Sequence, residues 1–218
     1  MRVVSIVPKA KQVAKNTHGR RVRRTPEEAR TLALASARRL LLADGPDAIT
    51  LQSVATDLGM SHTNLIHHFG SAAGLQSELM RQMMSELTAA IESAVMRLRA
   101  GKGEFRDFVD IVFDAFDRGG AGRLAAWIVL SGEATRLAPI GEVVRDTIDS
   151  VERGADQASA QDVHERVTSA TLFVTMAALG DAIIGNPLRR MVGRERDAVR
   201  KIIGRLLPVV LEHEASNG

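Results

Sequence analysis

Apolar residues recur at intervals of three and four along most of this chain, which is the period of an α-helix with one buried face. Strand-type alternation never holds for more than a few residues. The pattern therefore predicts an all-α fold of about nine helices. We expect Gly185, Asn186 and Pro187 to end a long apolar helix, and Pro208 to kink or shorten the last one. Beyond residue 74 the expected helices cover residues 75–99, 104–117, 123–136, 139–151, 161–184 and 195–213.

Residues 50–70 predict two short amphipathic helices joined by a tight turn, with the sequence TLQSVATDLGMSHTNLIHHFG. Thr50 and Ser61 are suited to cap the two helices, and Gly59 is suited to end the first in a left-handed conformation. The apolar residues of the second helix lie four apart on one face. A short helix with an exposed polar first turn suits insertion into the major groove of DNA. The outward-facing polar residues of that helix are His62, Thr63, Asn64 and His67.

The stretch 25–79 resembles the DNA-binding domain of the TetR family of bacterial transcription regulators. The resemblance rests on ALASARRLL from Ala33, VATDLGMS from Val54, HHF from His67 and GSAAGL from Gly70, all in one register. It implies a helix-turn-helix DNA-binding domain over residues 25–72. A larger helical domain for effector binding and dimerisation then follows over residues 73–218.

Two positions depart from the family pattern. Ile66 stands where members usually have a tyrosine, and Ala72 stands where they usually have a lysine. Both usual residues touch phosphates, so their loss predicts weaker binding unless positive charge comes from elsewhere.

The predicted partner is double-stranded DNA. His62, Thr63, Asn64 and His67 are expected near base edges, together with Gln52. Contacts to phosphates are expected from Thr50, Ser53, Ser61, Arg23 and Arg24.

The first 24 residues form a strongly basic segment, which we call the basic arm. It contains no acidic residue and carries a charge of +8, so the formal +3 of the whole chain leaves −5 for the rest. Its composition predicts a flexible arm, because it has too few apolar residues to fold alone. Three interpretations stay open: a targeting peptide, a solvated leader, and an arm that follows phosphates or enters the minor groove. The basic residues are Arg2, Lys9, Lys11, Lys15, Arg20, Arg21, Arg23 and Arg24.

Few aromatic residues occur in this chain, 3% in all, and most lie in the predicted regulatory domain. A phenylalanine stripe at helical spacing is ordinarily core, but part of it could line a cavity for a small apolar or aromatic effector. The predicted effector-binding residues are Phe113, Phe116, Trp127, Glu133, Phe173 and Met176.

The last two long helices carry apolar stripes that are wider than one helix pair can bury, which predicts a homodimer built from four helices. A two-fold dimer would place its two recognition helices on an inverted repeat. The predicted interface residues are Leu172, Leu179, Ile183, Ile203, Leu206 and Val210.

Other classes of protein fit less well. The chain has no Cys, which favours a cytoplasmic location, and residues 170–180 are too short an apolar stretch for a membrane span. No catalytic motif is present, the histidine spacing does not suit zinc, and neither a cofactor nor a metal is expected. The prediction is a non-enzymatic repressor released from its operator by an effector. The alternatives are a ligand-independent or activating regulator and, more remotely, a metal-dependent enzyme.

Overall fold

The computed structural model describes residues 25–152 and 160–213. The basic arm, with Arg23 and Arg24, lies outside the described residues. Within the described part the chain is helical and contains no strand, which confirms the predicted all-α fold. The α-helices are α1 (Pro26–Asp44), α2 (Leu51–Leu58), α3 (His62–Phe69), α4 (Ala72–Arg99), α5 (Phe105–Phe116), α6 (Ala121–Leu130), α7 (Ala138–Glu152), α8 (Ala160–Gly180), α9 (Asn186–Met191) and α10 (Ala198–His213). Short 3-10 helices η1 (Pro46–Ala48) and η2 (Ala134–Leu137) and a π-helical turn η4 (Asp181–Gly185) complete the set.

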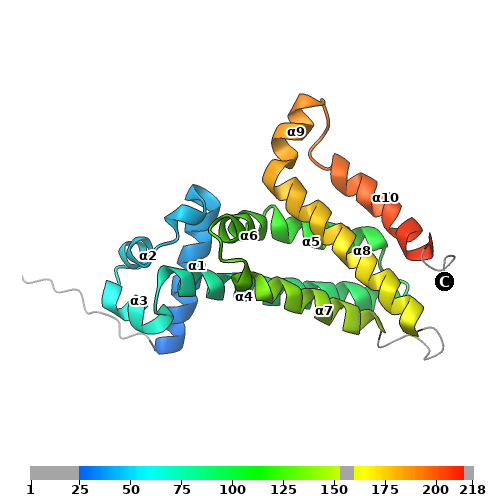
Figure 1. Ribbon diagram of the computed structural model, residues 1–218. Coiled ribbons are helices and arrows are strands. Elements are labelled where there is room, and N and C mark those ends of the chain that lie inside the picture. The colour runs from blue at the N-terminus through cyan, green and yellow to red at the C-terminus, as the bar shows by residue number, and fades with distance from the viewer. Residues whose placement is uncertain (1–24, 153–159, 214–218) are drawn as a thin grey trace, which may run out of the picture.

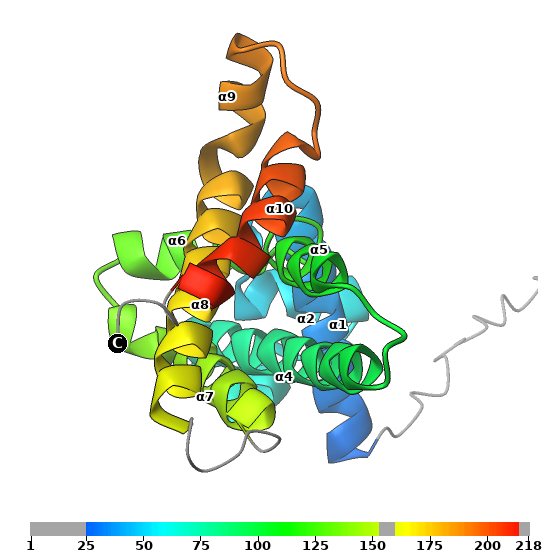
Figure 2. The ribbon, with the colours of Figure 1, turned by 90° about the vertical axis from the view of Figure 1, so that its right-hand side faces the viewer.

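The helices fall into a small head and a larger body (Figure 1). The head consists of α1, α2 and α3, which pack on one another and on the start of α4. From there α4 runs into the body, where it packs against α5, α6 and α7. Figure 2 shows α8 and α10 side by side across the body, with α9 projecting beyond it. The helix α4 is therefore the element that the head and the body share.

One continuous hydrophobic core joins the two parts. In the head Leu41, Val54 and Leu65 are fully buried, and the same cluster continues along α4 through Leu79 to Ile91. The first helix also has a strong N-terminal cap, because Thr25 and Glu28 form a reciprocal capping box. A change in the position of α4 would therefore reach the head directly.

Two predicted helix ends are wrong. The helix predicted over residues 123–136 stops at Leu130, and the chain then turns into η2. The predicted stop at Gly185, Asn186 and Pro187 is not a stop, because the chain continues through η4 into α9. Pro187 lies directly after the π-helical turn, in the first turn of α9. Pro208 lies inside α10, which runs on to His213, so it does not shorten the helix.

One helical run, His164–Met191, is long and apolar enough to cross a membrane when judged by length and composition alone. A third of its most apolar window, 33%, is buried inside the protein. This run is longer than the apolar stretch of residues 170–180, because the helix begins earlier and continues past Asp181. The core helix of a protein that never meets a membrane can pass the same test, so this run is weak evidence for a span.

Candidate nucleic-acid interface

Two side-chain caps and a glycine fix the turn between α2 and α3. Thr50 Oγ1 accepts a hydrogen bond from the Ser53 N–H at 3.0 Å, and Ser61 Oγ accepts one from the Asn64 N–H at 3.3 Å. Between them Gly59 adopts φ 61° and ψ 31°, the left-handed conformation that favours glycine. These two helices begin and end where the local sequence predicts.

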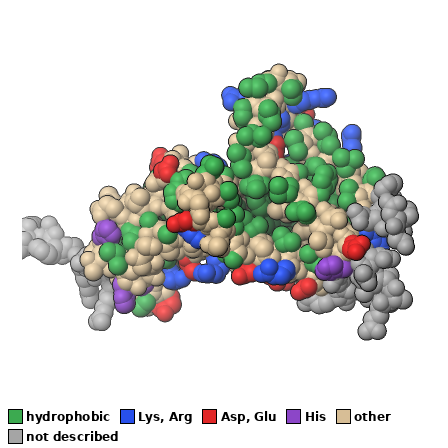
Figure 3. Space-filling model, viewed as in Figure 1, with side chains coloured by type: hydrophobic (Ala, Val, Ile, Leu, Met, Phe, Trp, Pro, Cys, Tyr) green, Lys and Arg blue, Asp and Glu red, His purple; other side chains and the backbone are tan. Residues whose placement is uncertain are grey.

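The helix α3 turns its apolar side inward and its polar side outward. Leu65 and Phe69 are buried in the head, one helical turn apart. The predicted base-contacting residues point away from that core: His62, Thr63 and His67 are exposed and Asn64 is half-buried. Figure 3 shows histidine side chains at this end of the molecule, with hydrophobic side chains beside them. We call the exposed side of α3 the α3 face.

The DNA-contacting residues predicted at α2 fall into two groups, one on the surface and one at the N-terminal cap of the helix. Gln52 is exposed, and its side-chain amide lies 3.4 Å from Thr56 Oγ1. Thr50 and Ser53 are half-buried, and their hydroxyl oxygens lie 2.8 Å apart. Their hydroxyls therefore serve the start of α2 first. Ser61 caps α3 in the same way, but it is exposed.

The described arginines of the head are all engaged with carboxylates. Arg30 pairs with Glu78 at 2.8 Å, Arg38 pairs with Glu86 at 2.5 Å, and Arg39 pairs with Asp57. Arg30 also donates to the His68 carbonyl and lies over the Phe69 ring. Residues 25–70 contain no lysine and no other arginine. Residues 25–70 carry five carboxylates against three arginines, so the described part of the head presents no free cation and a formal charge of −2.

The histidines of α3 do not form a metal site with acidic partners. The ring centroids of His67 and His68 lie 5.9 Å apart. Among the residues that the structure describes, no group of three or more histidines and carboxylates could hold a metal ion.

A glycine sets the approach of α4 to the recognition helix. A Cβ atom on Gly74 would clash with the carbonyl oxygen of Phe69, the last residue of α3. Ser71 caps α4 by accepting a hydrogen bond from the Gly74 N–H at 3.0 Å. Ala72, which stands at the usual lysine position, is half-buried in this first turn. The close contact between α3 and α4 therefore depends on Gly74.

A buried amide links the body to the start of the helix-turn-helix. The Gln76 side chain is buried, and its Nε2 donates to the Ile49 carbonyl at 3.2 Å, directly before the Thr50 cap. Arg136, from η2, donates to Gln76 Oε1 at 2.9 Å and to the Ala73 carbonyl at 2.8 Å. We call this chain of contacts the Arg136–Gln76 link. The sequence does not predict this link, because Arg136 and Gln76 lie 60 residues apart and no local pattern connects them.

Sequence comparisons give no match: no protein-family model and no curated protein matches this chain. Solved structures do match. A bacterial regulatory protein in the TetR family from Rhodococcus RHA1 is similar with a TM-score of 0.52 and 17% identity, over 85% of this chain and 96% of that one. The superantigen PfiT is similar with a TM-score of 0.52 and 18% identity, over 85% of this chain and 97% of that one.

The chain thus has the fold of a TetR-family regulator, and the resemblance seen in residues 25–79 is confirmed at the level of the fold. Because one fold can carry several functions, and one of these two proteins is a superantigen, the function must be argued from the sites of this chain.

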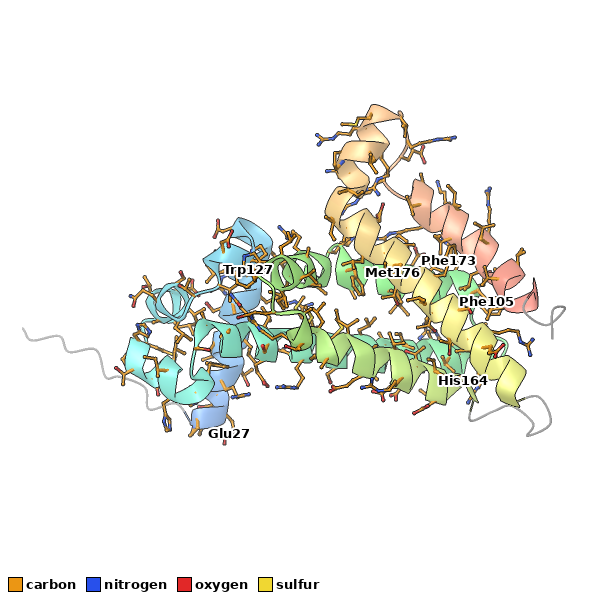
Figure 4. The ribbon with its side chains drawn as sticks, viewed as in Figure 1. Glu27, Phe105, Trp127, His164, Phe173 and Met176 are labelled. Carbon is orange, nitrogen blue, oxygen red and sulfur yellow. The ribbon has the colours of Figure 1, made fainter. Side chains whose placement is uncertain are left out.

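The predicted effector-binding residues do not line one cavity. Trp127 belongs to the contact with the head, because its Nε1 donates to Asp47 Oδ1 at 2.6 Å. Phe173 and Met176 lie on the exposed side of α8, with Met176 59% exposed. Figure 4 shows Trp127 next to the head and both of these residues on α8. Glu133 is exposed and pairs with Arg136, while Phe113 and Phe116 are packed in the core. The six residues are therefore spread over the core, the contact with the head and the surface of α8, and their role in effector binding stays a prediction.

The structure also has a partly open cavity of about 100 Å³ in the body, between α4, α5, α7, α8 and α10. A smaller one of about 20 Å³ adjoins it and shares Phe108, Thr147 and Thr171 with it. Of the predicted residues only Phe116 reaches the smaller cavity. The lining of the larger one is mainly apolar: Ala94, Val95, Leu98, Glu104, Phe105, Phe108, Thr147, Val167, Ala170, Thr171, Leu207 and Leu211.

A wide apolar surface covers the outer side of the last helices, and we call it the α8–α10 face (Figure 3). Of the predicted dimer residues, Leu172, Ile183 and Leu206 are exposed on it, while Leu179 and Val210 are half-buried. Ile203 is buried in this chain's own core, so its place in the prediction is wrong. The exposed large hydrophobic residues of the elements that form this face are Leu172, Phe173, Met176, Ile183, Ile184, Leu188, Met191, Val192, Ile202, Leu206 and Val209.

A groove of about 870 Å³ runs along this face between α8, η4 and α9 on one side and α10 on the other. At its base Asp181 and Arg189 form a buried ion pair. Burial raises the pKa of the Asp181 carboxyl, and Arg189 opposes that shift. A Cβ atom on Gly185 would clash with both side chains, so the ion pair can hold this position only beside a glycine.

Proposed function

We propose that this protein is a cytoplasmic transcriptional regulator that binds double-stranded DNA as a homodimer. Residues 25–72 would form the DNA-binding domain and residues 73–218 the effector-binding and dimerisation domain. We further propose that it is a repressor that leaves an inverted-repeat operator when a small apolar effector binds.

The observation that carries the proposal is the α3 face. Hydrogen-bonding side chains project from α3, a short helix whose other side is buried in the head. These side chains form no ion pair with the described residues. Base edges in the major groove present donors and acceptors at fixed positions, and a surface of neutral donors and acceptors is complementary to them. In this arrangement His62, Thr63, Asn64 and His67, together with Gln52, reach bases, while Ser61 and the basic arm contact the flanking phosphates.

The homodimer is supported by the α8–α10 face. Water-soluble monomers rarely expose so many neighbouring large hydrophobic side chains, and a second copy of the same face would cover them. Two-fold symmetry then places two α3 helices on successive turns of one side of the DNA, so the operator would be an inverted repeat.

Effector control is supported by the position of α4. Its C-terminal half contributes Ala94, Val95 and Leu98 to the body cavity, and its first turns hold the head through Gly74 and the Arg136–Gln76 link. A ligand that fits the cavity better when α4 has moved would favour the arrangement in which the two heads no longer match the operator.

The decisive experiment is selection of bound sequences from random duplex DNA by the full-length chain. We expect an enriched inverted repeat, and at least tenfold weaker binding to it after His67→Ala or Asn64→Ala, since a good base contact contributes roughly 1–3 kcal/mol. Ser85→Ala, an exposed polar residue on α4 outside the α3 face, is the matched control. Selection of no common sequence would refute the proposal.

A further inference from the structure

One apolar side chain interrupts the polar surface of the recognition helix. Among the described residues of α2 and α3, every large hydrophobic side chain is buried or half-buried except Ile66, which is 47% exposed. An isoleucine can neither donate to nor accept from a phosphate, so it cannot replace a hydrogen-bonding anchor at this position.

Helical geometry places Ile66 on the α3 face. Successive residues turn by 100°, so residues three and four apart are neighbours on a helix surface. Ile66 therefore lies beside Thr63 and His62, and its direction differs from that of the buried Leu65 by a quarter-turn or more. It belongs to the same exposed surface as the predicted base contacts.

The major groove offers one apolar feature, the C5-methyl group of thymine. Phosphates and the other base edges are polar, and burying Ile66 against them would leave their hydrogen-bonding groups unsatisfied. We propose that Ile66 is a specificity-determining residue that reads a thymine by packing on its methyl group. This inference rests on the proposed DNA-binding function and adds the base that each half-site must contain.

The test replaces thymine by deoxyuridine, which removes only the methyl group. After the operator has been selected from random DNA, each thymine of both half-sites is replaced in turn, and binding of the full-length chain is measured at fixed salt. At one symmetric position the replacement should weaken binding about fourfold per half-site, the effect of one buried methyl group. Ile66→Ala should bind the thymine operator correspondingly more weakly and should no longer distinguish thymine from deoxyuridine.

Two further variants separate Ile66 from its neighbourhood. Thr63→Ser removes the adjacent methyl group and should keep the preference for thymine. Ile66→Val, which retains two methyl groups, should keep part of it. Thermal unfolding of each variant shows whether the head is intact, and because Ile66 is exposed we expect little change.

Three results would overturn the inference while leaving DNA binding in place. These are an operator without a conserved thymine, equal affinity after every replacement, and a preference that survives Ile66→Ala. A chain that selects no sequence at all would instead refute the proposed function and this inference with it.

Discussion

The α3 face and the α8–α10 face leave opposite kinds of side chain uncovered. The first presents hydroxyl, amide and imidazole groups with a single isoleucine among them, whereas the second presents eleven large hydrophobic side chains. A polar surface with fixed donors and acceptors matches a partner that carries a hydrogen-bonding pattern, as DNA does. An apolar surface of that extent gains free energy only when another apolar surface covers it.

The two faces are also held differently. The α3 face is fixed locally, by caps at Thr50 and Ser61 and by the close contact at Gly74. The α8–α10 face lies on helices that α5 and α7 support from beneath, and α4 packs on both of these supporting helices. Since α4 connects the two regions, pairing of two bodies would determine the distance between two heads. Substitutions that alter one face at a time should therefore have separable effects on pairing and on DNA binding.

The largest effect is expected from a charge on the α8–α10 face. Leu172→Asp or Leu206→Asp would bury a carboxylate against a second copy, so the dimer should dissociate at micromolar concentration. One head would then bind without its partner, and operator affinity should fall about a hundredfold or more as the bivalent advantage is lost. Sedimentation and gel-shift titration measure the two effects.

The matched control for these variants is Met96→Asp on α4, because Met96 is 65% exposed outside the α8–α10 face. It should leave both the dimer and DNA affinity unchanged. A Leu172→Asp variant that remains dimeric would show that the exposed apolar surface has another purpose.

The next largest effect is expected from removing the positive charge of the basic arm, because the α3 face has no cation of its own. Deletion of residues 2–22 removes six of the eight cations of the basic arm. If the arm binds phosphates, the plot of log affinity against log salt should become shallower by about 0.9 for each phosphate that these cations neutralise. Affinity at low salt should fall about tenfold or more for the same reason.

A variant with the same six cations replaced by glutamine separates charge from chain length. It should behave like the deletion. An unchanged salt dependence in both variants would mean that the neutral α3 face binds without help from the arm.

Local features of the fold could be predicted from the sequence, because the residues that determine them lie within a few positions of each other. The α2–α3 turn is an example: Thr50, Gly59 and Ser61 each act on their own helix end. Periodicity failed where both sides of a helix are apolar. In α8 it could not distinguish Phe173 and Met176, which face outward, from Val174 and Ala178, which are buried.

Long-range contacts were not predictable for a different reason. Trp127 was expected in a ligand cavity, yet its indole N–H donates to Asp47, 80 residues earlier in the chain. The cavity of the body forms where five helices fail to fill the space between them, and no single segment signals such a gap. Ile203 was misplaced because the rotation of α10 about its axis is decided by its packing on α5 and α8.

A smaller effect is expected from breaking the Arg136–Gln76 link, which connects the body to the head. Arg136→Met should break the Arg136–Gln76 link and leave the buried Gln76 oxygen without its donor, which costs about 1–3 kcal/mol of unfolding free energy. Urea unfolding measures this destabilisation. Arg118→Met, which removes an exposed pair with Asp114, is the control and should cost no more than about 1 kcal/mol. Equal destabilisation by the two variants would show that the link is not a special connection.

The smallest effect is expected inside the body, where a ligand would act on both faces at once. The cavity is somewhat smaller than an engineered apolar cavity of roughly 150 Å³ that binds benzene, so benzene and toluene are suitable probes. At about ten times its dissociation constant, either probe should stabilise the protein by roughly 1.4 kcal/mol and raise Tm by about 3–6 °C. Ala170→Leu, which adds volume to the lining, should abolish this rise and leave DNA affinity intact. A rise that persists in Ala170→Leu would place the probe elsewhere, most simply on the exposed α8–α10 face, and would remove the support for control through α4.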